Sequence, residues 1–325
     1  MKILIIRNDH LGDLIISLPL IESLKRDNPE LSINLLVAEE FLVIPQWLSS
    51  IDKIFFQYKN ENIKDLAERL SNFDFKMVLS FPSTRENAIL VKKLRIPVKI
   101  GYAGKIYNWF SFNRLVFIRR SHPPVHEQEF MAAFCKRAGF KINIPFDFKL
   151  KIPQKILTEK EDFIKNFTDK EFITIHPGGR GSSDNFSLKT WAFVAKMLSE
   201  KIEENVFFVL GPFESLTDDI KNILLNSNVK IIKDISITEL AILLNKAKFI
   251  VSGNTGPMHL GAILGRRTLS FFSSRKTESK EKWRPLSKNA LIFCAKKGKT
   301  LEESFNVSQI TEIIQSNLKD KEMLL

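Results

Sequence analysis

The sequence predicts an α/β protein built from two doubly wound, Rossmann-like domains, and three observations support this prediction. With 325 residues, the chain exceeds the length at which one hydrophobic core usually keeps growing. It opens with a strand, a glycine-containing loop and a helix, an order typical of a parallel sheet. The alternation stops at residues 141–154 and then restarts. We therefore expect domains over residues 1–150 and 151–325, an arrangement that leaves the final helix free to pack back on the first domain.

In the first domain, short β-branched runs alternate with helical patterns. Lys2–Arg7 predicts a strand, after which the chain turns through Gly12 into a helix beginning near Asp13. Apolar runs predict further strands, and apolar positions at helical spacing predict further helices. The strands are expected at 32–37, 52–56, 76–79 and 98–101, and the helices at 63–70, 86–93 and 127–137.

The second domain follows an extended passage that Pro145 and Pro153 interrupt. The sequence has no G-x-G-x-x-G or Walker A loop, which disfavours a dehydrogenase or a P-loop enzyme. Strands are expected at 172–176, 205–210, 230–232, 249–252 and 290–294, and helices at 188–201, 216–225, 238–245 and 308–318.

The charge of the chain predicts an acidic partner. A formal charge of +12 at pH 7 fits nucleic acid, an anionic membrane surface or a phosphorylated substrate. The basic residues are spread along the chain without a known nucleic-acid motif, which disfavours nucleic acid. No segment is apolar for long enough to span a bilayer, and the two cysteines lack metal or redox spacing. We expect a cytoplasmic protein, peripheral at most to the membrane, and a monomer.

The run Phe249–Gly265 is typical of half a nucleotide-binding unit, with a strand, a loop and a helix. Pro257 suits the first helical position. Thr255 and Gly256 are then expected at the cap, where free amides and the helix dipole attract phosphate. Thr255 adds a hydroxyl, and His259 is within reach of a phosphate or a ribose. Ordinary helix capping explains the same residues, so the motif alone leaves both interpretations open.

Two further loops of the second domain follow predicted strands. Residues 176–183 are rich in glycine and hydroxyls, so their backbone can approach a diphosphate that Arg180 can neutralise. Glu214 is placed to accept hydrogen bonds from two ribose hydroxyls. Each loop is also compatible with a simple surface turn. Because ligands of open α/β sheets bind at the carboxyl ends of strands, the coincidence of three such loops favours a binding site.

In the first domain, Asp13 is the comparable residue. Position alone favours a helix-capping carboxylate, because Asp is among the best capping residues. The functional alternative is a carboxylate at the carboxyl end of the first strand that accepts a proton from an acceptor hydroxyl.

The chain carries a series of motifs at Arg7, Leu11–Asp13, Pro19, residues 176–179, Gly211–Pro212 with Glu214, and residues 254–260. Together with weaker similarity at 83–85, 100–102, 126–127 and 283–285, they run along nearly the whole chain and resemble glycosyltransferase family 9, the heptosyltransferase family. The resemblance implies a GT-B architecture, in which two Rossmann-like domains face each other across a cleft. It also implies inverting transfer of a heptose from ADP-heptose to the inner core of lipopolysaccharide, an anionic glycolipid at the inner leaflet, with no metal or other cofactor.

The resemblance further implies roles for individual residues. Asp13 is implied as the general base, with Arg7, Gly12 and Arg85 on the acceptor side. The implied nucleotide-sugar site consists of Gly178, Gly179, Arg180, Lys189, Glu214, Asn254, Thr255, Gly256, Pro257 and His259.

Two positions depart from the family pattern. Asn254 stands where many members have Asp, and Asp184–Ser187 occupies the place of a segment that often carries a phosphate-binding Lys. Arg180 or Lys189 would have to supply that charge, and Asp184 would be unfavourable near a diphosphate unless turned away. The alternatives are a family 9 enzyme with another donor or acceptor, or an impaired homologue that binds nucleotide-sugar or glycolipid without transfer.

Overall fold

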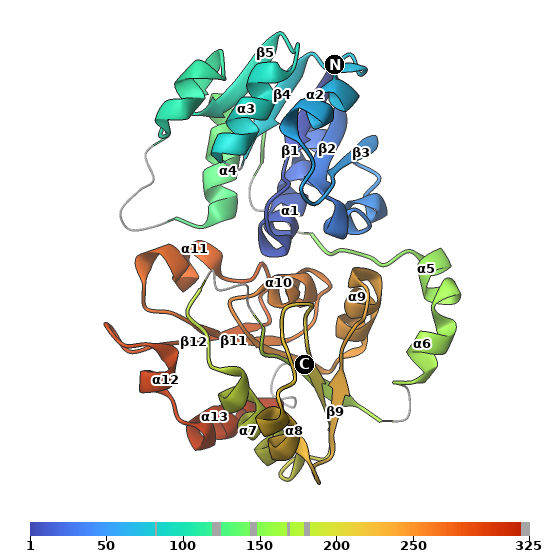
Figure 1. Ribbon diagram of the computed structural model, residues 1–325, viewed down its shortest axis with the longest axis vertical. Coiled ribbons are helices and arrows are strands. Elements are labelled where there is room, and N and C mark those ends of the chain that lie inside the picture. The colour runs from blue at the N-terminus through green and yellow to red at the C-terminus, as the bar shows by residue number, and fades with distance from the viewer. Residues whose placement is uncertain (82, 119–124, 144–147, 168–169, 179–182, 320–325) are drawn as a thin grey trace. The chain divides into compact units, whose positions relative to one another are not determined.

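The protein consists of two compact units, Met1–Phe148 and Lys149–Leu325. The computed structural model describes residues 1–81, 83–118, 125–143, 148–167, 170–178 and 183–319. Each unit contains a six-stranded sheet whose strands all pair in parallel, with helices packed beside it (Figure 1). The predicted α/β class with two doubly wound sheets is confirmed, and the break between the units lies close to the one predicted after residue 150.

The first unit has the strand order β3-β2-β1-β4-β5-β6. The chain fills one side of the sheet from β1 to β3, returns to place β4 beside β1, and then fills the other side. The strands are β1 (Lys2–Ile6), β2 (Ser32–Ala38), β3 (Lys53–Gln57), β4 (Met77–Ser80), β5 (Val98–Tyr102) and β6 (Arg114–Val116). The helices are α1 (Leu11–Asp27), α2 (Ile63–Ser71), α3 (Arg85–Lys93) and α4 (Glu127–Arg137), with short 3-10 helices η1 (Glu39–Phe41), η2 (Ile44–Trp47) and η3 (Ile106–Phe110).

The second unit has the equivalent strand order β12-β11-β10-β7-β8-β9. The direction in which the chain adds strands to the sheet therefore reverses between β7 and β10, as it does between β1 and β4 in the first unit. The strands are β7 (Phe172–His176), β8 (Asn205–Val209), β9 (Val229–Ile232), β10 (Phe249–Gly253), β11 (Thr268–Phe272) and β12 (Ala290–Cys294). The helices are α5 (Gln154–Glu159), α6 (Glu161–Lys165), α7 (Leu188–Ser199), α8 (Asp218–Leu224), α9 (Ile237–Lys246), α10 (Gly256–Ile263), α11 (Lys280–Trp283), α12 (Leu301–Ser304) and α13 (Val307–Lys319), with the 3-10 helix η4 (Lys276–Glu278).

The sequence prediction missed two strands, β6 and β11, and several short helices, among them α5 and α6. Strand β6 is only three residues long and lies at the edge of its sheet, so it offers little pattern. Strand β11 contains Thr268 and Ser270, which are fully buried, and these polar residues conceal a central strand. Helices α5 and α6 are short and bury no residue completely, so they lack the apolar stripe of a longer helix.

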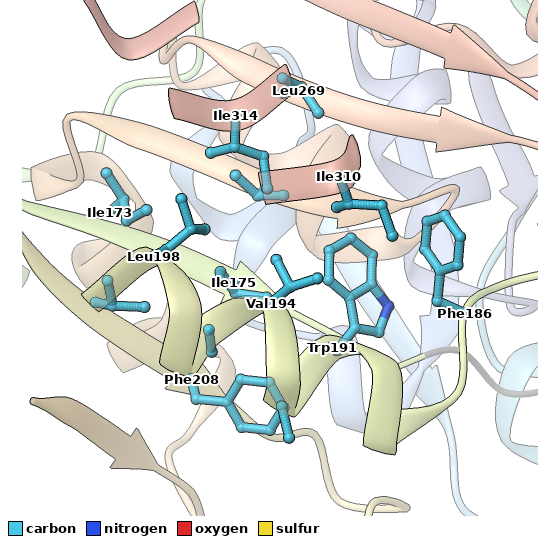
Figure 2. Packing of buried hydrophobic residues seen from close by; sticks show 14 of the residues in the cluster. Ile173, Ile175, Phe186, Trp191, Val194, Leu198, Phe208, Leu269, Ile310 and Ile314 are labelled. Atoms are coloured by element: carbon cyan, nitrogen blue, oxygen red, sulfur yellow. The ribbon is translucent and has the colours of Figure 1, made fainter. Parts of the chain in front are cut away.

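Trp191 is central to the core of the second unit. This α7 side chain is fully buried, and its ring packs edge-on against Phe186 at 5.3 Å between ring centroids (Figure 2). Ile310 and Ile314 of α13 belong to the same buried cluster, and α13 packs against α7. The final helix therefore contributes to the core of the second unit.

In the part of the chain that the structure describes, no helix is both long and apolar enough to cross a membrane. Both cysteines are free thiols. Burial raises the pKa of Cys135 to about 12, so this thiol stays protonated at neutral pH. Cys294 is half-buried at the end of β12.

Candidate active site

Asp13 lies at the reversal of strand order in the first unit, where α1 follows β1. Helix α1 begins earlier than predicted, because His10 occupies the N-cap position. Asp13 is therefore in the first turn and is not the cap, which corrects the capping interpretation. Gly12 precedes it in the same turn. In doubly wound sheets such a reversal opens the crevice in which ligands bind.

The side chain of Arg7 holds Asp13 in place. Arg7 Nε donates to the backbone carbonyl of Asp13, and Nη2 donates to its Oδ1, both at 3.0 Å. Arg7 Nη1 pairs on its other side with Asp9 Oδ2 at 3.3 Å. Only 3% of the Arg7 side chain is exposed, against 19% for Asp13. Arg7 thus lies behind the carboxylate, and Asp13 is the member of the pair that reaches solvent.

Asp9 is a further member of this cluster that the sequence analysis did not single out. Burial raises the pKa of Asp9 to about 6, although the Arg7 guanidinium opposes the shift. For Arg7, burial lowers the pKa, but Asp9, Asp13 and the buried Glu127 outweigh it and raise the pKa above its ordinary value. The site therefore contains one permanent cation among three carboxyl groups.

A polar network joins the end of β1 to the start of α3. The Asn8 amide donates to Asn87 Oδ1 at 3.1 Å, and the Asn87 amide donates back to Asn8 Oδ1 at 2.9 Å. The Asn8 amide also donates to Gln57 at the end of β3. Arg85 is exposed and is the first residue of α3. The fold therefore brings Arg85 to the same sheet edge as Asp13, and its acceptor-binding role stays a prediction.

In the second unit, three predicted loops meet at one edge, because β10, β7 and β8 are neighbouring parallel strands. Glu214 joins the loops after β7 and β8. Its Oε2 accepts a hydrogen bond from the Gly211 amide. A Cβ atom at Gly178 would lie only 2.2 Å from Glu214 Oε1, so no other residue fits there without moving the carboxylate. This contact explains why glycine and Glu214 occur together at the predicted ribose subsite.

A chain of hydroxyls connects β10 to β7. Ser252 Oγ donates to the His176 carbonyl at 3.0 Å and lies 2.7 Å from Thr255 Oγ1. A serine hydroxyl has one proton, so Thr255 must be the donor in the second bond. The Thr255 proton is therefore directed into the protein, and a contact of this hydroxyl with phosphate stays a prediction. Burial lowers the pKa of His176 to about 4, so this ring is neutral at pH 7.

Helix α10 begins one residue earlier than predicted, with Thr255 at the N-cap and Gly256 as its first residue. Pro257 is consequently second, and the amides of Gly256 and Met258 lie in the turn where an α-helix has no internal partners for its N–H groups. His259 is in the same turn, with only 3% of its surface exposed.

The loop after β10 is also tied to the chain that precedes α7. The Asn254 carbonyl accepts a hydrogen bond from the Ser183 hydroxyl at 3.2 Å. The backbone of Asn254 is therefore fixed in part by this hydrogen bond. Contacts of the predicted residues around it with a nucleotide stay predictions.

The segment before α7 is held by Asn185 and Asp184. The Asn185 amide donates to the Pro177 carbonyl at 2.8 Å, and its Oδ1 accepts from Trp191 Nε1 at 3.3 Å. Asp184 Oδ2 accepts a hydrogen bond at 2.9 Å from the amide of Leu301, the first residue of α12. The Asp184 carboxylate is thus bound at a helix N-terminus, which is a favourable place for negative charge.

Three predicted residues remain to be placed. Lys189 is exposed in the first turn of α7. Gly179 and Arg180 lie outside the described residues. Among the residues that the structure does describe, no group of three or more His, Cys, Asp or Glu side chains is arranged to hold a metal ion.

Comparison with known proteins identifies the family. The family model for glycosyltransferase family 9 (heptosyltransferase) matches residues 63–309. The chain belongs to glycosyltransferase family 9. It is therefore a glycosyltransferase, as predicted. The chain is 26% identical over 299 residues to lipopolysaccharide heptosyltransferase 1 of Campylobacter coli, which covers 84% of each chain.

Solved structures of family 9 proteins share the fold of this chain. The family 9 glycosyltransferase of Veillonella parvula has a TM-score of 0.80 at 16% identity, over 98% of this chain and 97% of the other. The E. coli ADP-heptose lps heptosyltransferase II has a TM-score of 0.79 at 18% identity, over 98% of both chains. The predicted GT-B architecture of two Rossmann-like units is confirmed.

For this family 9 glycosyltransferase, we predict that Ser252→Ala lowers the free energy of unfolding by about 1–3 kcal/mol, because it leaves the Thr255 hydroxyl and the His176 carbonyl without their buried partner. Urea denaturation measures the change. Ser316→Ala is the matched control, since Ser316 is exposed and bonds only within α13; we expect a change within about 0.5 kcal/mol. Equal effects of the two substitutions would contradict the buried hydroxyl chain.

The raised pKa of Asp9 predicts a pH-dependent stability. The pKa of Asp9 is about 6 in the folded state, against its ordinary value of 3.8 in the unfolded chain. The free energy of unfolding should therefore fall by about 2 kcal/mol through this group as pH rises from 4 to 6. Asp9→Asn should remove that part of the slope in urea denaturation series. Parallel pH profiles for the variant and the wild type would refute the shift.

Proposed function

We propose that this glycosyltransferase moves a heptose from ADP-heptose to a hydroxyl of an anionic glycolipid such as the inner core of lipopolysaccharide. Asp13 removes the proton from the acceptor hydroxyl. The acceptor oxygen then attacks the anomeric carbon, and the bond from that carbon to the diphosphate oxygen breaks. ADP leaves with the bonding electron pair, and the configuration at the anomeric carbon is inverted. No cofactor or metal takes part in this proposal.

The observation that carries the proposal is the partly exposed Asp13 carboxylate, held by buried Arg7 at the strand reversal of the first unit. A general base must present an ionised oxygen in a fixed direction to the hydroxyl. Arg7 fixes the orientation of Asp13 by donating hydrogen bonds to its backbone carbonyl and to its Oδ1.

The glycine-lined edge of the second unit supports the donor side of the proposal. Glu214 accepts the ribose hydroxyls, while Gly178 and the first turn of α10 lie against the diphosphate. Helix-end amides stabilise the charge that develops on the leaving group. Arg180 and Lys189 are proposed to add the positive charge that the missing family Lys would otherwise supply. The E. coli neighbour named for ADP-heptose favours this nucleotide-sugar as donor.

The charge of the chain supports an anionic acceptor at a membrane surface. A net charge of +12 attracts a phosphorylated glycolipid and the anionic lipids around it. We propose that the protein acts as a monomer in the cytoplasm, peripherally at the inner face of the membrane, and that nucleic acid is not its partner.

A different donor sugar is the alternative favoured by Asn254. An Asn side chain keeps hydrogen bonding but loses the charge of the Asp found in many family members. Asp184 gives less support to an impaired homologue, since its carboxylate is bound to the Leu301 amide.

We predict that Asp13→Asn lowers kcat for heptose transfer by about 10²–10⁴-fold, the usual contribution of a general base. Binding of ADP should be unchanged, because the substitution leaves the proposed donor unit intact. Asp65→Asn is the matched control, since Asp65 also lies in the first turn of a helix of the first unit. Transfer assays with both variants measure the effect, and full activity of Asp13→Asn would exclude Asp13 as the base.

A thermal-shift titration tests the donor site. In the presence of a chelator, ADP and ADP-heptose should raise the melting temperature, because a ligand of the folded state stabilises it by about 2.7 kcal/mol at a hundred times its Kd. Glu214→Ala should reduce the shift, while Glu200→Ala, which removes an exposed carboxylate after α7, should preserve it. A larger shift with UDP or GDP would reassign the donor. Absence of any nucleotide shift would favour the impaired homologue.

A further inference from the structure

The first unit carries an exposed apolar patch made of Ile106, Trp109, Phe110 and Phe117. These side chains are exposed by 78%, 54%, 74% and 60%, respectively. Scattered single hydrophobic residues are normal on protein surfaces, but a cluster of large ones marks an interaction site. Elsewhere among the described residues, the exposed large hydrophobic side chains are spread over both units: Met1, Tyr58, Ile89, Val125, Phe193, Phe213 and Leu225.

The apolar patch is supported from below by buried polar contacts. Trp109 Nε1 donates to the Ala103 carbonyl at 2.9 Å, and the Trp109 and Phe117 rings meet edge-on at 5.8 Å. The amide of Asn108, which is 1% exposed, donates to the Tyr102 carbonyl at 2.7 Å. The patch is therefore held in shape by η3 and its anchors before any partner arrives.

The apolar patch lies within a basic stretch of the sequence. Residues 87–126 contain no Asp or Glu but eight Lys or Arg, so this stretch alone carries a formal charge of +8. Lys105 directly precedes η3, Arg114 lies between the two halves of the patch, and both are exposed. The side chain of Arg137 donates to the Phe117 carbonyl. Exposed apolar side chains among basic residues match a bilayer with anionic headgroups, which offers hydrocarbon beneath negative charge.

The apolar patch and Asp13 lie at the same edge of the sheet. The Ala103 amide donates to the Val116 carbonyl at 3.0 Å, which places Ala103 and Phe117 at the carboxyl ends of β5 and β6. Asp13 follows the carboxyl end of β1, three strands away in the order β1-β4-β5-β6. At about 4.8 Å between strands, the lateral separation is roughly 14 Å. A headgroup held in a bilayer beside the patch can therefore extend to Asp13.

We propose that the first unit docks on an anionic lipid bilayer through the apolar patch, with Lys105 and Arg114 contacting the headgroups. The docking presents the reacting part of a membrane-held acceptor to Asp13. This purpose rests on the proposed function, but the docking itself does not require sugar transfer.

Vesicle binding by the full chain tests the apolar patch. We expect wild-type protein to co-sediment with vesicles of phosphatidylglycerol and phosphatidylcholine, and less with phosphatidylcholine alone. Ile106→Ser with Phe110→Ser should lower the partition coefficient by about tenfold or more, because each removes a membrane-buried apolar side chain. Phe193→Ser with Leu225→Ser is the matched control, since it removes two exposed hydrophobic side chains of the second unit, and it should bind like wild type.

The charge contribution has its own variants. Lys105→Ser and Arg114→Ser should each weaken binding to the anionic vesicles by about fivefold, with little effect on neutral ones. Lys59→Ser is the control, because it removes an exposed Lys outside the basic stretch. Binding should also fall as salt screens the headgroups. The proposal would be overturned if the wild-type protein did not bind anionic vesicles at low salt. It would also be overturned if the patch variants bound these vesicles as tightly as the wild type.

Two further outcomes separate this proposal from its rivals. If the wild type is a dimer in solution and Ile106→Ser with Phe110→Ser is a monomer, the patch is a surface between copies of the chain and the bilayer assignment is wrong. Transfer to a delipidated, water-soluble acceptor should be unchanged in the patch variants. Vesicle binding without any transfer would refute the proposed function and leave the docking surface intact.

Discussion

The reversal of strand order between β1 and β4, and again between β7 and β10, is the constraint on which both candidate sites depend. Crossovers between parallel strands are right-handed, so a chain that reverses direction places its helices on opposite faces of the sheet. The loops that begin these helices diverge at the reversal and leave a crevice at the carboxyl edge. Asp13 lies at one reversal, and Gly178 and Thr255 flank the other.

At the first reversal, the protein buries charge next to its proposed base. Removing Arg7 and Asp9 from water is costly, and a buried ion pair is weak evidence for stability. The geometry of the ion pair suits the positioning of Asp13 instead. One guanidinium donates hydrogen bonds to the carbonyl and Oδ1 of Asp13 and forms an ion pair with Asp9. The raised pKa of Asp9 is a direct sign of the cost, since burial there outweighs the neighbouring positive charge.

At the second reversal, the loops are tied from inside the unit. Ser252 bonds to the end of β7, Asn185 bonds to the carbonyl of Pro177, and Trp191 anchors Asn185 from the core. These contacts satisfy polar groups at the glycine-lined edge. Asp184 ties the same segment to α12, because its carboxylate accepts a hydrogen bond from the amide of Leu301 at the start of that helix. The Asp184 carboxylate is therefore paired with the Leu301 amide within the second unit.

Sequence patterns by themselves determined the α/β class, most strands and the three loops of the second unit, because hydrophobic periodicity and glycine-rich strand ends are local signals. They failed at β11, where buried Thr268 and Ser270 interrupt the apolar run, and at the exact start of α1. Only the tertiary structure decided that buried Arg7 binds the Asp13 carboxylate and that Asp9 forms an ion pair with the same guanidinium. It also decided that the Thr255 hydroxyl donates its proton to Ser252, inside the protein. These properties depend on distances between side chains and on burial, and neither is encoded in the spacing of residues along a chain.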